Sequence, residues 1–440
     1  MKRYEKYKPT GINCLSEIPE HWKIDNFGKH FTFGKGLPIT KADLTKEGIA
    51  VISYGQVHSK LNTGVTLNNS LIRYVSPKWL NTNSQNLLNK CDFVFADTSE
   101  DIAGAGNCAF NDYSKPIFAG YYIVIARPTE VENSRYWAYL FQSNCWKSQV
   151  QSLVNGVKVY SINKSILKKS AILIPPISEQ YKIVAYLSKR ITLIESCKCQ
   201  RERELQTLNE LKQTEIASVV TRGLNPDVHM KDSGIPWIGR IPKHWETKRI
   251  ATHFHNRIEN NNDFEFKHAF KFNYGEIVPK NEIGTPEEYH DIYIKYSKVK
   301  KNDIIINGLN LNYDFVSQRV AIVPNDGIIT SAYIVLRPFS TTIAPYFCYL
   351  FKAMDYMKLF HAMGTGIRLT LSFDELKRQI IPIPPIEEQN AIVEYIESKT
   401  SKIDTMIEAL KAEIDRLIEY KQRLISDVVT GQIDVRGEQI

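Results

Sequence analysis

The 440-residue sequence predicts an α+β protein in which two similar globular α/β domains are joined by two long antiparallel coiled-coil helices. Three observations predict this fold. The same short motifs occur twice in the same order, which indicates an internal pseudo-two-fold repeat. Each copy ends in an apolar-periodic segment without Pro or Gly, and the segment before it mixes β-type runs with turns.

The repeat is clearest in two motifs. Ile18–Trp22 (IPEHW) recurs as Ile241–Trp245 (IPKHW), and Ile174–Gln180 (IPPISEQ) recurs as Ile383–Gln389 (IPPIEEQ). The segments before the double prolines have diverged, whereas those after them align without gaps. The sequence therefore predicts two differing domains on a shared scaffold.

The repeat also gives the expected domain organisation. We expect a first domain over residues 1–170, a central helix over 171–222, a second domain over 223–380, and a distal helix with a tail over 381–440. Within the first domain, Tyr121–Ala126 is typical of a strand and Tyr136–Val150 of a helix.

Each segment after a double proline predicts about forty residues of helix, because proline can precede a helix but cannot continue one. Leu187 and Ile194 in the first copy, and Ile396 and Ile403 in the second, belong to apolar stripes with 3-4 spacing. Such stripes predict that the two helices pack on each other. A two-fold relation makes them antiparallel, and it places the end of the second helix beside the first domain.

Composition gives weaker indications. The formal charge of +8 suits a polyanionic partner but is also common among ordinary proteins. The seven cysteines have no zinc-site spacing, and neither an apolar leader nor a membrane-length apolar run occurs. We therefore expect a reduced, cytoplasmic protein without a metal.

The motifs resemble one family in particular. Ser233–Gly239 (SGIPWIG) followed by Ile241–Trp245, the two IPPIxEQ motifs and the order domain, helix, domain, helix are similar to the specificity (S) subunit of type I restriction-modification systems. The resemblance covers essentially the whole chain. In the first copy, Asn13–Ser16 departs from the PWIG of the second.

The resemblance implies a non-catalytic subunit that binds double-stranded DNA. Each target-recognition domain would read one half of a split site, while the helices would set the gap and dock two modification (methyltransferase) subunits. Those partners would bind S-adenosylmethionine, so no cofactor is expected in this chain. Restriction (motor-nuclease) subunits would join the complex for cleavage.

Candidate DNA-binding residues combine cations, amides and hydroxyls with flexible glycines, because Arg and Lys suit guanine or phosphate and Asn suits adenine. Ordinary turns and solvated loops explain the same patterns. The candidates are Lys35, Lys41, Lys158, Tyr160, Asn310, Asn312, Arg319, Arg368 and Thr370.

Candidate partner-binding residues recur identically in both helices, although core packing does not require them. We expect them on exposed helix faces that form a shared partner surface, with a solvated face as the alternative. They are Glu179, Gln180, Lys212, Gln213, Glu388, Gln389, Lys421 and Gln422.

Two other functions are open. A self-contained DNA methyltransferase or endonuclease needs catalytic residues, but Gly34–Gly36 fails as a P-loop, no Asn/Asp-Pro-Pro-Tyr/Phe segment occurs, and His253 with His255 is typical of a surface. A coiled-coil adaptor that does not bind DNA would explain the helices but not the two diverged domains. We therefore predict no catalytic residues.

Overall fold

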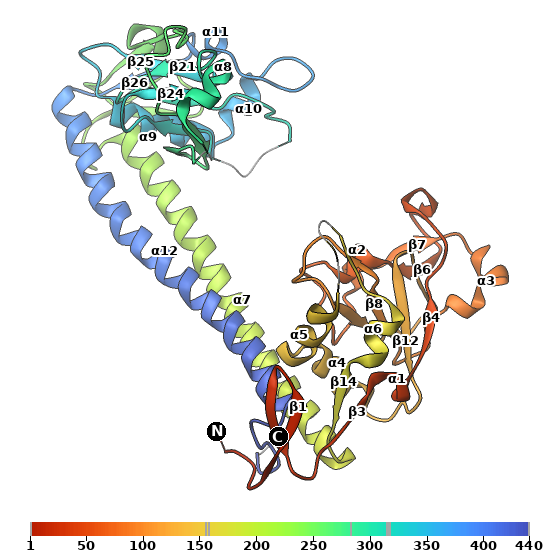
Figure 1. Cartoon of the computed structure of the whole chain (residues 1–440). Helices are drawn as coiled ribbons and strands as arrows, with labels where there is room; N and C mark the ends of the chain where they lie inside the picture. The colour runs from red at the N-terminus through yellow and green to blue at the C-terminus, as the bar shows by residue number, and fades with distance from the viewer. Residues whose placement is uncertain (1, 155, 157–158, 282–283, 314–317, 439–440) are drawn as a thin grey trace. The chain divides into compact units, whose positions relative to one another are not determined.

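The computed structural model describes the chain except residues 1, 155, 157–158, 282–283, 314–317 and 439–440. The chain forms two compact units (Figure 1). Unit 1 contains residues 1–201 and 412–440, and unit 2 contains residues 202–411. The division runs through the two long helices, so each helix contributes residues to both units.

The globular part of unit 1 is built from fourteen short strands and six helices within its described residues. In chain order these are β1 (Tyr7–Ile12), β2 (Leu15–Pro19), β3 (Lys23–Asn26), α1 (Phe27–His30), β4 (Phe31–Lys35), β5 (Leu44–Thr45), β6 (Ile49–Ile52), α2 (Tyr54–Val57), β7 (Arg73–Val75), α3 (Trp79–Thr82), β8 (Phe93–Ala96), β9 (Thr98–Ser99), β10 (Cys108–Phe110), β11 (Ile117–Ala119), β12 (Ile123–Pro128), α4 (Ser134–Gln142), α5 (Asn144–Leu153), β13 (Tyr160–Ser161), α6 (Lys164–Lys169) and β14 (Ala171–Ile174).

Two four-stranded sheets form the centre of this domain. The first is antiparallel in the order β10-β8-β12-β4, and the second has the order β11-β6-β7-β5 with β11 parallel to β6. The first sheet packs on α4 and α5 through buried aromatic side chains, among them Phe93, Phe141 and Trp146. Alternate residues of β8 face opposite sides, so Phe93 and Phe95 join this core while Val94 joins the core between the sheets.

Unit 2 repeats this plan. Its elements are β15 (Met230–Asp232), β16 (Arg240–Pro242), β17 (Glu246–Arg249), β18 (Phe254–Asn256), β19 (Phe270–Asn273), β20 (Glu276–Pro279), α8 (His290–Tyr293), β21 (Ser297–Val299), β22 (Ile304–Ile306), β23 (Val320–Ile322), β24 (Gly327–Ile329), β25 (Ile334–Pro338), α9 (Ala344–Tyr356), α10 (Leu359–Met363), α11 (Phe373–Leu376) and β26 (Ile380–Ile383).

The main sheet of unit 2 is antiparallel in the order β18-β25-β22-β23, which is the order of the matching strands in unit 1. Both sheets carry the same ion pair on a buried aspartate, between Arg127 and Asp92 (3.2 Å) in unit 1 and between Arg337 and Asp303 (Nε to Oδ1 2.8 Å) in unit 2. Asp92 in Lys90–Val94 (KCDFV) and Asp303 in Lys301–Ile305 (KNDII) occupy matching places of the two copies, so the pair is part of the repeated scaffold.

One predicted helix is two helices. The segment expected as a single helix over Tyr136–Val150 breaks at Ser143, which separates α4 from α5. Ser143 is extended (φ −69°, ψ 151°), and its Oγ accepts a hydrogen bond from the Trp146 N–H at 3.2 Å. The serine thus acts as an N-cap that starts a second helix in a new direction.

The two long helices are α7 (Ile177–Arg222, 46 residues) and α12 (Ile386–Val429, 44 residues), as the periodicity predicts. In unit 1, Lys421 of α12 pairs with Glu195 of α7 at 2.7 Å, and Glu413 pairs with Arg201 at 3.1 Å. The partner number on α12 falls as the number on α7 rises, so the helices run antiparallel there (Figure 1).

Unit 2 shows the same direction. Lys212 pairs with Asp404 at 2.6 Å, and the Tyr395 hydroxyl donates to Glu215 at 2.5 Å. Lys212 and Asp404 stand 209 positions from the Lys421 and Glu195 of unit 1, so the two lysine ion pairs are pseudo-symmetric copies of one contact.

The end of α12 lies beside the first domain, as the repeat predicts. The Tyr136 hydroxyl donates to the Val429 carbonyl at 3.3 Å, and the Asp434 N–H donates to the Lys2 carbonyl at 2.9 Å. In unit 2 the matching Tyr346 hydroxyl donates to the Val220 carbonyl of α7 at 2.9 Å. Each globular domain is therefore anchored on the last turns of a long helix.

A second anchor, which we call the glutamate clamp, lies at the start of each helix. In unit 1, Glu179 accepts hydrogen bonds from Trp22 Nε1 (3.0 Å), Tyr4 Oη (3.0 Å) and His21 Nε2 (2.6 Å). In unit 2, Glu388 accepts from Trp245 Nε1 (2.9 Å) and from Nε2 of the neighbouring histidine (2.5 Å). The two motifs that define the repeat in the sequence are thus partners in the structure.

The glutamate clamp makes a testable prediction about stability. Trp22→Phe removes an N–H donor from a buried carboxylate, and we expect it to lower the free energy of unfolding by about 1.5–3 kcal/mol more than Trp146→Phe. Trp146 is a matched control, because it is equally buried and its Nε1 makes no hydrogen bond to the described residues. Urea unfolding of both full-length variants measures the difference, and equal losses would contradict a role for the hydrogen bond.

Candidate nucleic-acid interface

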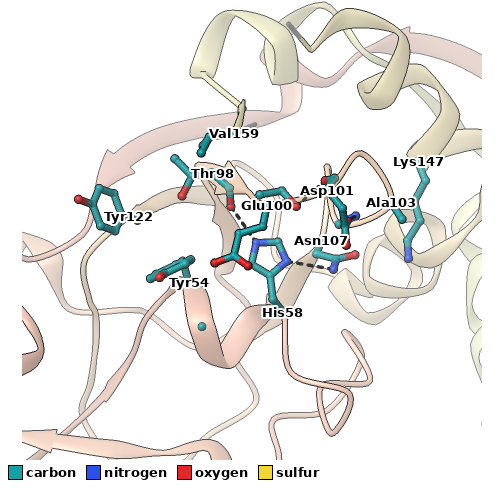
Figure 2. Close-up of a pocket in the computed structure, with 13 residues that line it drawn as sticks. Tyr54, His58, Thr98, Glu100, Asp101, Ala103, Asn107, Tyr122, Lys147 and Val159 are labelled. Atoms are coloured by element: carbon teal, nitrogen blue, oxygen red, sulfur yellow. Dashed lines mark hydrogen bonds between the residues drawn. The ribbon is translucent and has the colours of Figure 1, made fainter. Parts of the chain in front are cut away.

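A cleft of about 670 Å³ opens on the first domain. Figure 2 shows Tyr54 and Tyr122 at one end, His58 at the centre, and Asp101 and Lys147 toward the other end. The lining comes from α2, from the β9 turn, from Tyr122 before β12, from α5 and from Val159 before β13, so five separated segments of sequence build one recess. Tyr122 is 57% exposed and has a left-handed φ of 56°.

Hydrogen bonds hold the central imidazole in place. Its Nε2 donates to the Thr98 carbonyl at 2.8 Å, and its Nδ1 accepts from Asn107 Nδ2 at 3.3 Å (Figure 2). Gly104 lies against His58 so closely that an added Cβ would stand 3.0 Å from Nδ1. The floor of the cleft is therefore fixed before any ligand arrives.

The chemistry of the cleft favours a base edge over a phosphate. Glu100 and Asp101 are exposed acceptors on its lining, and a carboxylate suits the amino group of cytosine. The two tyrosine rings offer flat apolar surfaces at the opposite end. Lys147 is the cation among the described residues of the lining.

In unit 2 the structure brings together four of the predicted DNA-binding residues. Thr365 and Thr370 pair as the base of a tight hairpin whose tip carries Arg368, and Asn312 Nδ2 donates to the Ile367 carbonyl of that hairpin at 3.2 Å. The Leu311 N–H also donates to the Leu369 carbonyl at 3.0 Å. The loop that contains Asn310 and Asn312 therefore packs against the hairpin that contains Arg368 and Thr370.

The surface formed by this loop and hairpin, which we call the hairpin surface, exposes several large side chains. Ile367 is 97% exposed and Tyr313 is 77% exposed, and Asn310 and Arg368 are also exposed. Gly366 at the tip has a φ of +77°, a left-handed conformation that favours glycine. An apolar side chain beside a cation on a projecting turn suits insertion at a DNA groove.

Arg319 does not join this surface, and the prediction that it is available to read a base is wrong. It is 1% exposed, and its Nη1 donates to the carbonyls of Leu309 (2.8 Å) and Asn307 (3.1 Å). Its own N–H donates to the carboxylate of Asp355 at 2.6 Å. Burial raises the pKa of Asp355, and the hydrogen bond from this N–H opposes the shift. Arg319 therefore supports the amide-rich loop from beneath.

The other predicted DNA-binding residues lie in unit 1. Lys35 ends β4 and Lys41 begins a short 3₁₀ turn; both are exposed, but neither lines the cleft. Tyr160 is half-buried in β13, next to Val159 of the cleft lining. Lys158 lies outside the described residues.

Gly36, next to Lys35, has a packing role, in keeping with the ordinary turn that explains this pattern equally well. The Gly36 N–H donates to the Ile123 carbonyl at 3.2 Å, and a Cβ on Gly36 would lie 1.7 Å from the Gly120 carbonyl oxygen. A glycine is needed there because two backbones approach each other.

The expectation that the partner-binding candidates lie on exposed helix faces is wrong for most of them. Glu179, Gln180 and Gln389 are at most 7% exposed, and the two glutamines donate from Nε2 to the carbonyls of Pro175 (3.0 Å) and Pro384 (2.9 Å). Glu388 belongs to the glutamate clamp. These residues recur in both copies because each copy needs the same internal contacts.

The remaining candidates are half-buried. Lys212 and Lys421 form the interhelical ion pairs described above, and Gln422 donates to the Gln142 carbonyl at 2.7 Å. Gln213 is half-buried as well. The repeated polar residues therefore do not form a fully solvated helix face.

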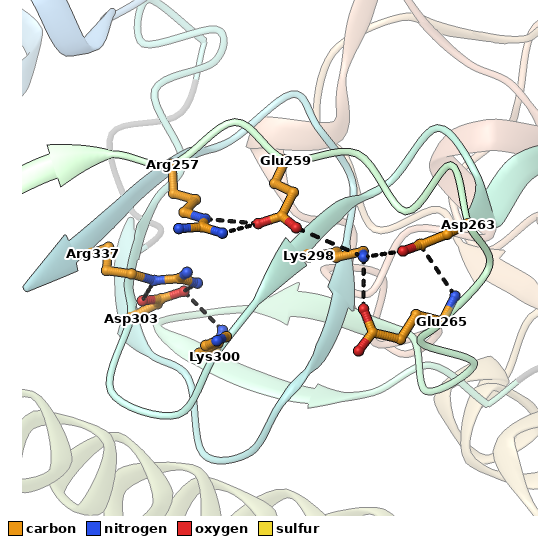
Figure 3. A network of polar contacts seen from close by, with 8 residues as sticks. All are labelled: Arg257, Glu259, Asp263, Glu265, Lys298, Lys300, Asp303 and Arg337. Atoms are coloured by element: carbon orange, nitrogen blue, oxygen red, sulfur yellow. Dashed lines mark hydrogen bonds and ion pairs between the residues drawn. The ribbon is translucent and has the colours of Figure 1, made fainter.

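A polar network that sequence reasoning missed organises another part of unit 2 (Figure 3). Lys298 Nζ lies 2.7 Å from carboxylate oxygens of both Asp263 and Glu265 and 3.7 Å from Glu259, which also pairs with Arg257. These hydrogen bonds raise the pKa of Lys298. The lysine ties the segment 257–266 to β21. Its acidic partners are largely exposed, so this region does not suit phosphate contact.

Among the described residues, no group of three or more His, Cys, Asp or Glu side chains is placed to hold a metal ion. In the same part of the chain, no helix has both the length and the apolar character that crossing a membrane requires.

Comparison with known proteins agrees with this architecture of two copies. Residues 19–207 and 242–416 match the family model "Type I restriction modification DNA specificity domain". The type I restriction enzyme MjaVIII specificity subunit of Methanocaldococcus jannaschii is 22% identical over 444 aligned positions, which cover 96% of this chain and 95% of that subunit. The EcoBI specificity subunit of Escherichia coli is 23% identical over 305 positions, which cover 65% of this chain and 63% of that subunit.

A solved structure from a study of complex assembly and conformational transition in the type I R-M system has the same fold. It superposes with a TM-score of 0.67 at 15% identity, covering 94% of this chain and 99% of that one. The fold thus defines a duplicated protein of two α+β domains carried on two long helices. The matched regions span most of the sequence, and the chain belongs to the family of type I restriction-modification specificity subunits.

Because Arg319 is buried and Arg368 is exposed, we expect their substitutions to have different effects on the free energy of unfolding. Arg319→Met removes a buried donor to two carbonyls, and we expect it to lower the free energy of unfolding by about 2–4 kcal/mol. Arg368→Met changes an exposed side chain and should stay within about 0.5 kcal/mol of the parent protein. Urea unfolding of both variants tests this, and equal small effects would contradict the supporting role of Arg319.

Proposed function

We propose that this chain is the DNA-reading subunit of a type I restriction-modification complex and reads a two-part DNA sequence. The domain over residues 1–170 reads one part, and the domain over 223–380 reads the other. One observation carries this proposal: the scaffold contacts are the same in both copies, whereas the domain segments between them have diverged in sequence. The glutamate clamp and the Arg–Asp pair recur, but unit 1 exposes a cleft and unit 2 exposes the hairpin surface.

In this proposal, α7 (Ile177–Arg222) and α12 (Ile386–Val429) set the gap between the two half-sites. Long helices suit that role because their length is fixed by 1.5 Å per residue. The chain acts on double-stranded DNA in the cytoplasm. Two modification subunits supply S-adenosylmethionine and the methyl transfer, and restriction subunits join for cleavage.

On unit 2 we assign DNA contact to Asn310, Asn312, Arg368 and Thr370. The two loops that hold them are joined by hydrogen bonds, which gives the surface the rigidity that base readout needs. Arg368 lies beside an almost fully exposed isoleucine, a combination that suits a guanine edge and a neighbouring thymine methyl group.

On unit 1 we assign base contact to the cleft, with its carboxylates as acceptors for a base amino group. Tyr160 belongs to the strand at its rim, and Lys158 precedes it by two positions in the sequence. Lys35 and Lys41 are exposed cations elsewhere on the domain, and we assign them to phosphate contact. Phosphate contacts position a protein without reading sequence.

The internal contacts of the helix candidates leave a smaller surface for the modification subunits. We propose that the partners dock on the outward faces of α7 and α12 around Gln213, and that the lysine ion pairs stiffen these faces, while Gln422 is occupied by its contact with the first domain. Glu179, Gln180, Glu388 and Gln389 act through the helix starts that they hold in place.

The first experiment tests the function as a whole. We expect the 50.6 kDa chain, co-expressed with its cognate modification subunit, to form a complex of one copy with two modification subunits that methylates adenines in a split motif. Mass photometry gives the stoichiometry, and sequencing of methylated adenines gives the motif. Methylation or cutting by the purified chain alone would show it to be a self-contained enzyme. A complex without DNA binding would show it to be an adaptor.

Arg368 gives the sharper test of readout. We expect Arg368→Gln to weaken binding to the cognate site by about 1–3 kcal/mol and to relax one position in one half of the methylated motif. Arg378→Gln is the matched control, since it removes an exposed arginine of the same unit with the same change of charge. Motifs that relax equally in both variants, or in neither, would contradict base readout by Arg368.

A further inference from the structure

Two cysteines that are distant in sequence meet on the first domain. Cys14 lies in the turn between β1 and β2, and Cys145 lies in the first turn of α5. Their sulfur atoms are 3.4 Å apart, and the Cys14 thiol also donates to the Cys145 carbonyl at 3.2 Å. Both thiols are free. A disulfide needs a sulfur separation near 2.05 Å, so a movement of roughly 1.4 Å joins them.

The two thiols differ in access. Cys14 is exposed, whereas Cys145 is 7% exposed. Burial raises the pKa of the Cys145 thiol well above its usual range, the adjacent Cys14 adds to the shift, and the Gln149 amide opposes it. An oxidant in solution therefore reaches Cys14 first, and Cys145 is the thiol that resolves the oxidised product.

The repeat provides an internal comparison. In the second copy Trp237 stands where the first has Cys14, and Asp355 stands where it has Cys145, counting from the matched Tyr349 and Tyr139. Asp355 is buried and accepts a hydrogen bond from the Arg319 N–H. The scaffold thus accepts other residues at both places, and the thiol pair is a feature of the first copy alone.

We propose that Cys14 and Cys145 are a reversible oxidation site, at which a hydroperoxide converts the two thiols to a disulfide that staples the first hairpin to α5. The Cys14 thiolate attacks one peroxide oxygen, the O–O bond breaks, and a sulfenic acid and one water form. The Cys145 sulfur then attacks the Cys14 sulfur, its thiol proton passes to the departing hydroxyl, and the S–O bond breaks to release a second water. Two electrons pass from the thiols to hydrogen peroxide, and two thiols reverse the step by exchange.

The staple acts at a junction of several segments. The hairpin carries Tyr7, whose hydroxyl donates to the Gly431 carbonyl at 2.9 Å, and α5 begins at Asn144, whose N–H donates to Ser426 Oγ of α12 at 2.9 Å. The bond would link positions 131 residues apart, a long loop for which cross-linking restricts the unfolded chain strongly. Oxidation is therefore expected to stabilise the attachment of the first domain to α12.

The test uses the full-length chain and hydrogen peroxide. We expect mass spectrometry of an alkylated, unreduced digest to find a Cys14–Cys145 peptide, and dithiothreitol to remove it. The melting temperature should rise by about 5 °C or more on oxidation, as for a disulfide that closes a long loop in a domain of this size. Cys14→Ser changes an exposed residue and should abolish both effects.

Cys199→Ser is the matched control, because it removes an exposed thiol on α7 and should keep both effects. Conversion of Cys14 to a sulfinic acid with Cys145 still reduced would overturn the proposal. A cross-link without a rise in melting temperature would overturn the staple. Neither result bears on DNA reading, since this site is independent of the proposed function.

Discussion

The hydrogen-bonded carboxylate at the start of each long helix, buried in Glu179 and half-buried in Glu388, is the contact on which the fold depends most. Burying a charged group is unfavourable unless hydrogen bonds replace its water, and Glu179 receives three such bonds from Trp22, Tyr4 and His21. The first turn of a helix also favours a negative charge, because its backbone N–H groups are unpaired. The Glu179 carboxylate is thus stabilised both by the three side-chain donors and by the helix N-terminus. These contacts fix where the first residues of the domain pack on the helix.

The contacts along the helices depend on the same duplication. An apolar seam alone allows two helices to slide, since one leucine can replace another along the stripe. The ion pairs of Lys212 with Asp404 and of Lys421 with Glu195 occur at equivalent places, and an exchange of register would break both at once. Each pair is partly exposed and contributes little to stability, so its main effect is to specify alignment.

The sequence predicts the helices and the repeat well, because periodicity and repeated motifs are local patterns. It does not predict the surroundings of Glu179, whose Trp22 partner is 157 positions away. The repeated polar residues therefore suggested a shared outer surface, although they form repeated internal contacts. The burial of Arg319 is not predictable from the sequence for a related reason. Arginines are seldom buried, and only the fold shows that the Arg319 guanidinium donates to two loop carbonyls. The cleft gave no sequence signal, since its lining is drawn from several separated segments.

The tip of the hairpin surface and the lining of the cleft take no part in the glutamate clamps, the Arg–Asp pairs or the helix seam. Substitutions at exposed positions such as Ile367 or Glu100 consequently leave the folding equilibrium almost unchanged. A gene for this chain can therefore accumulate substitutions in these exposed residues while the encoded protein still folds. A new combination of exposed side chains on these two surfaces then requires no compensating substitution in the scaffold.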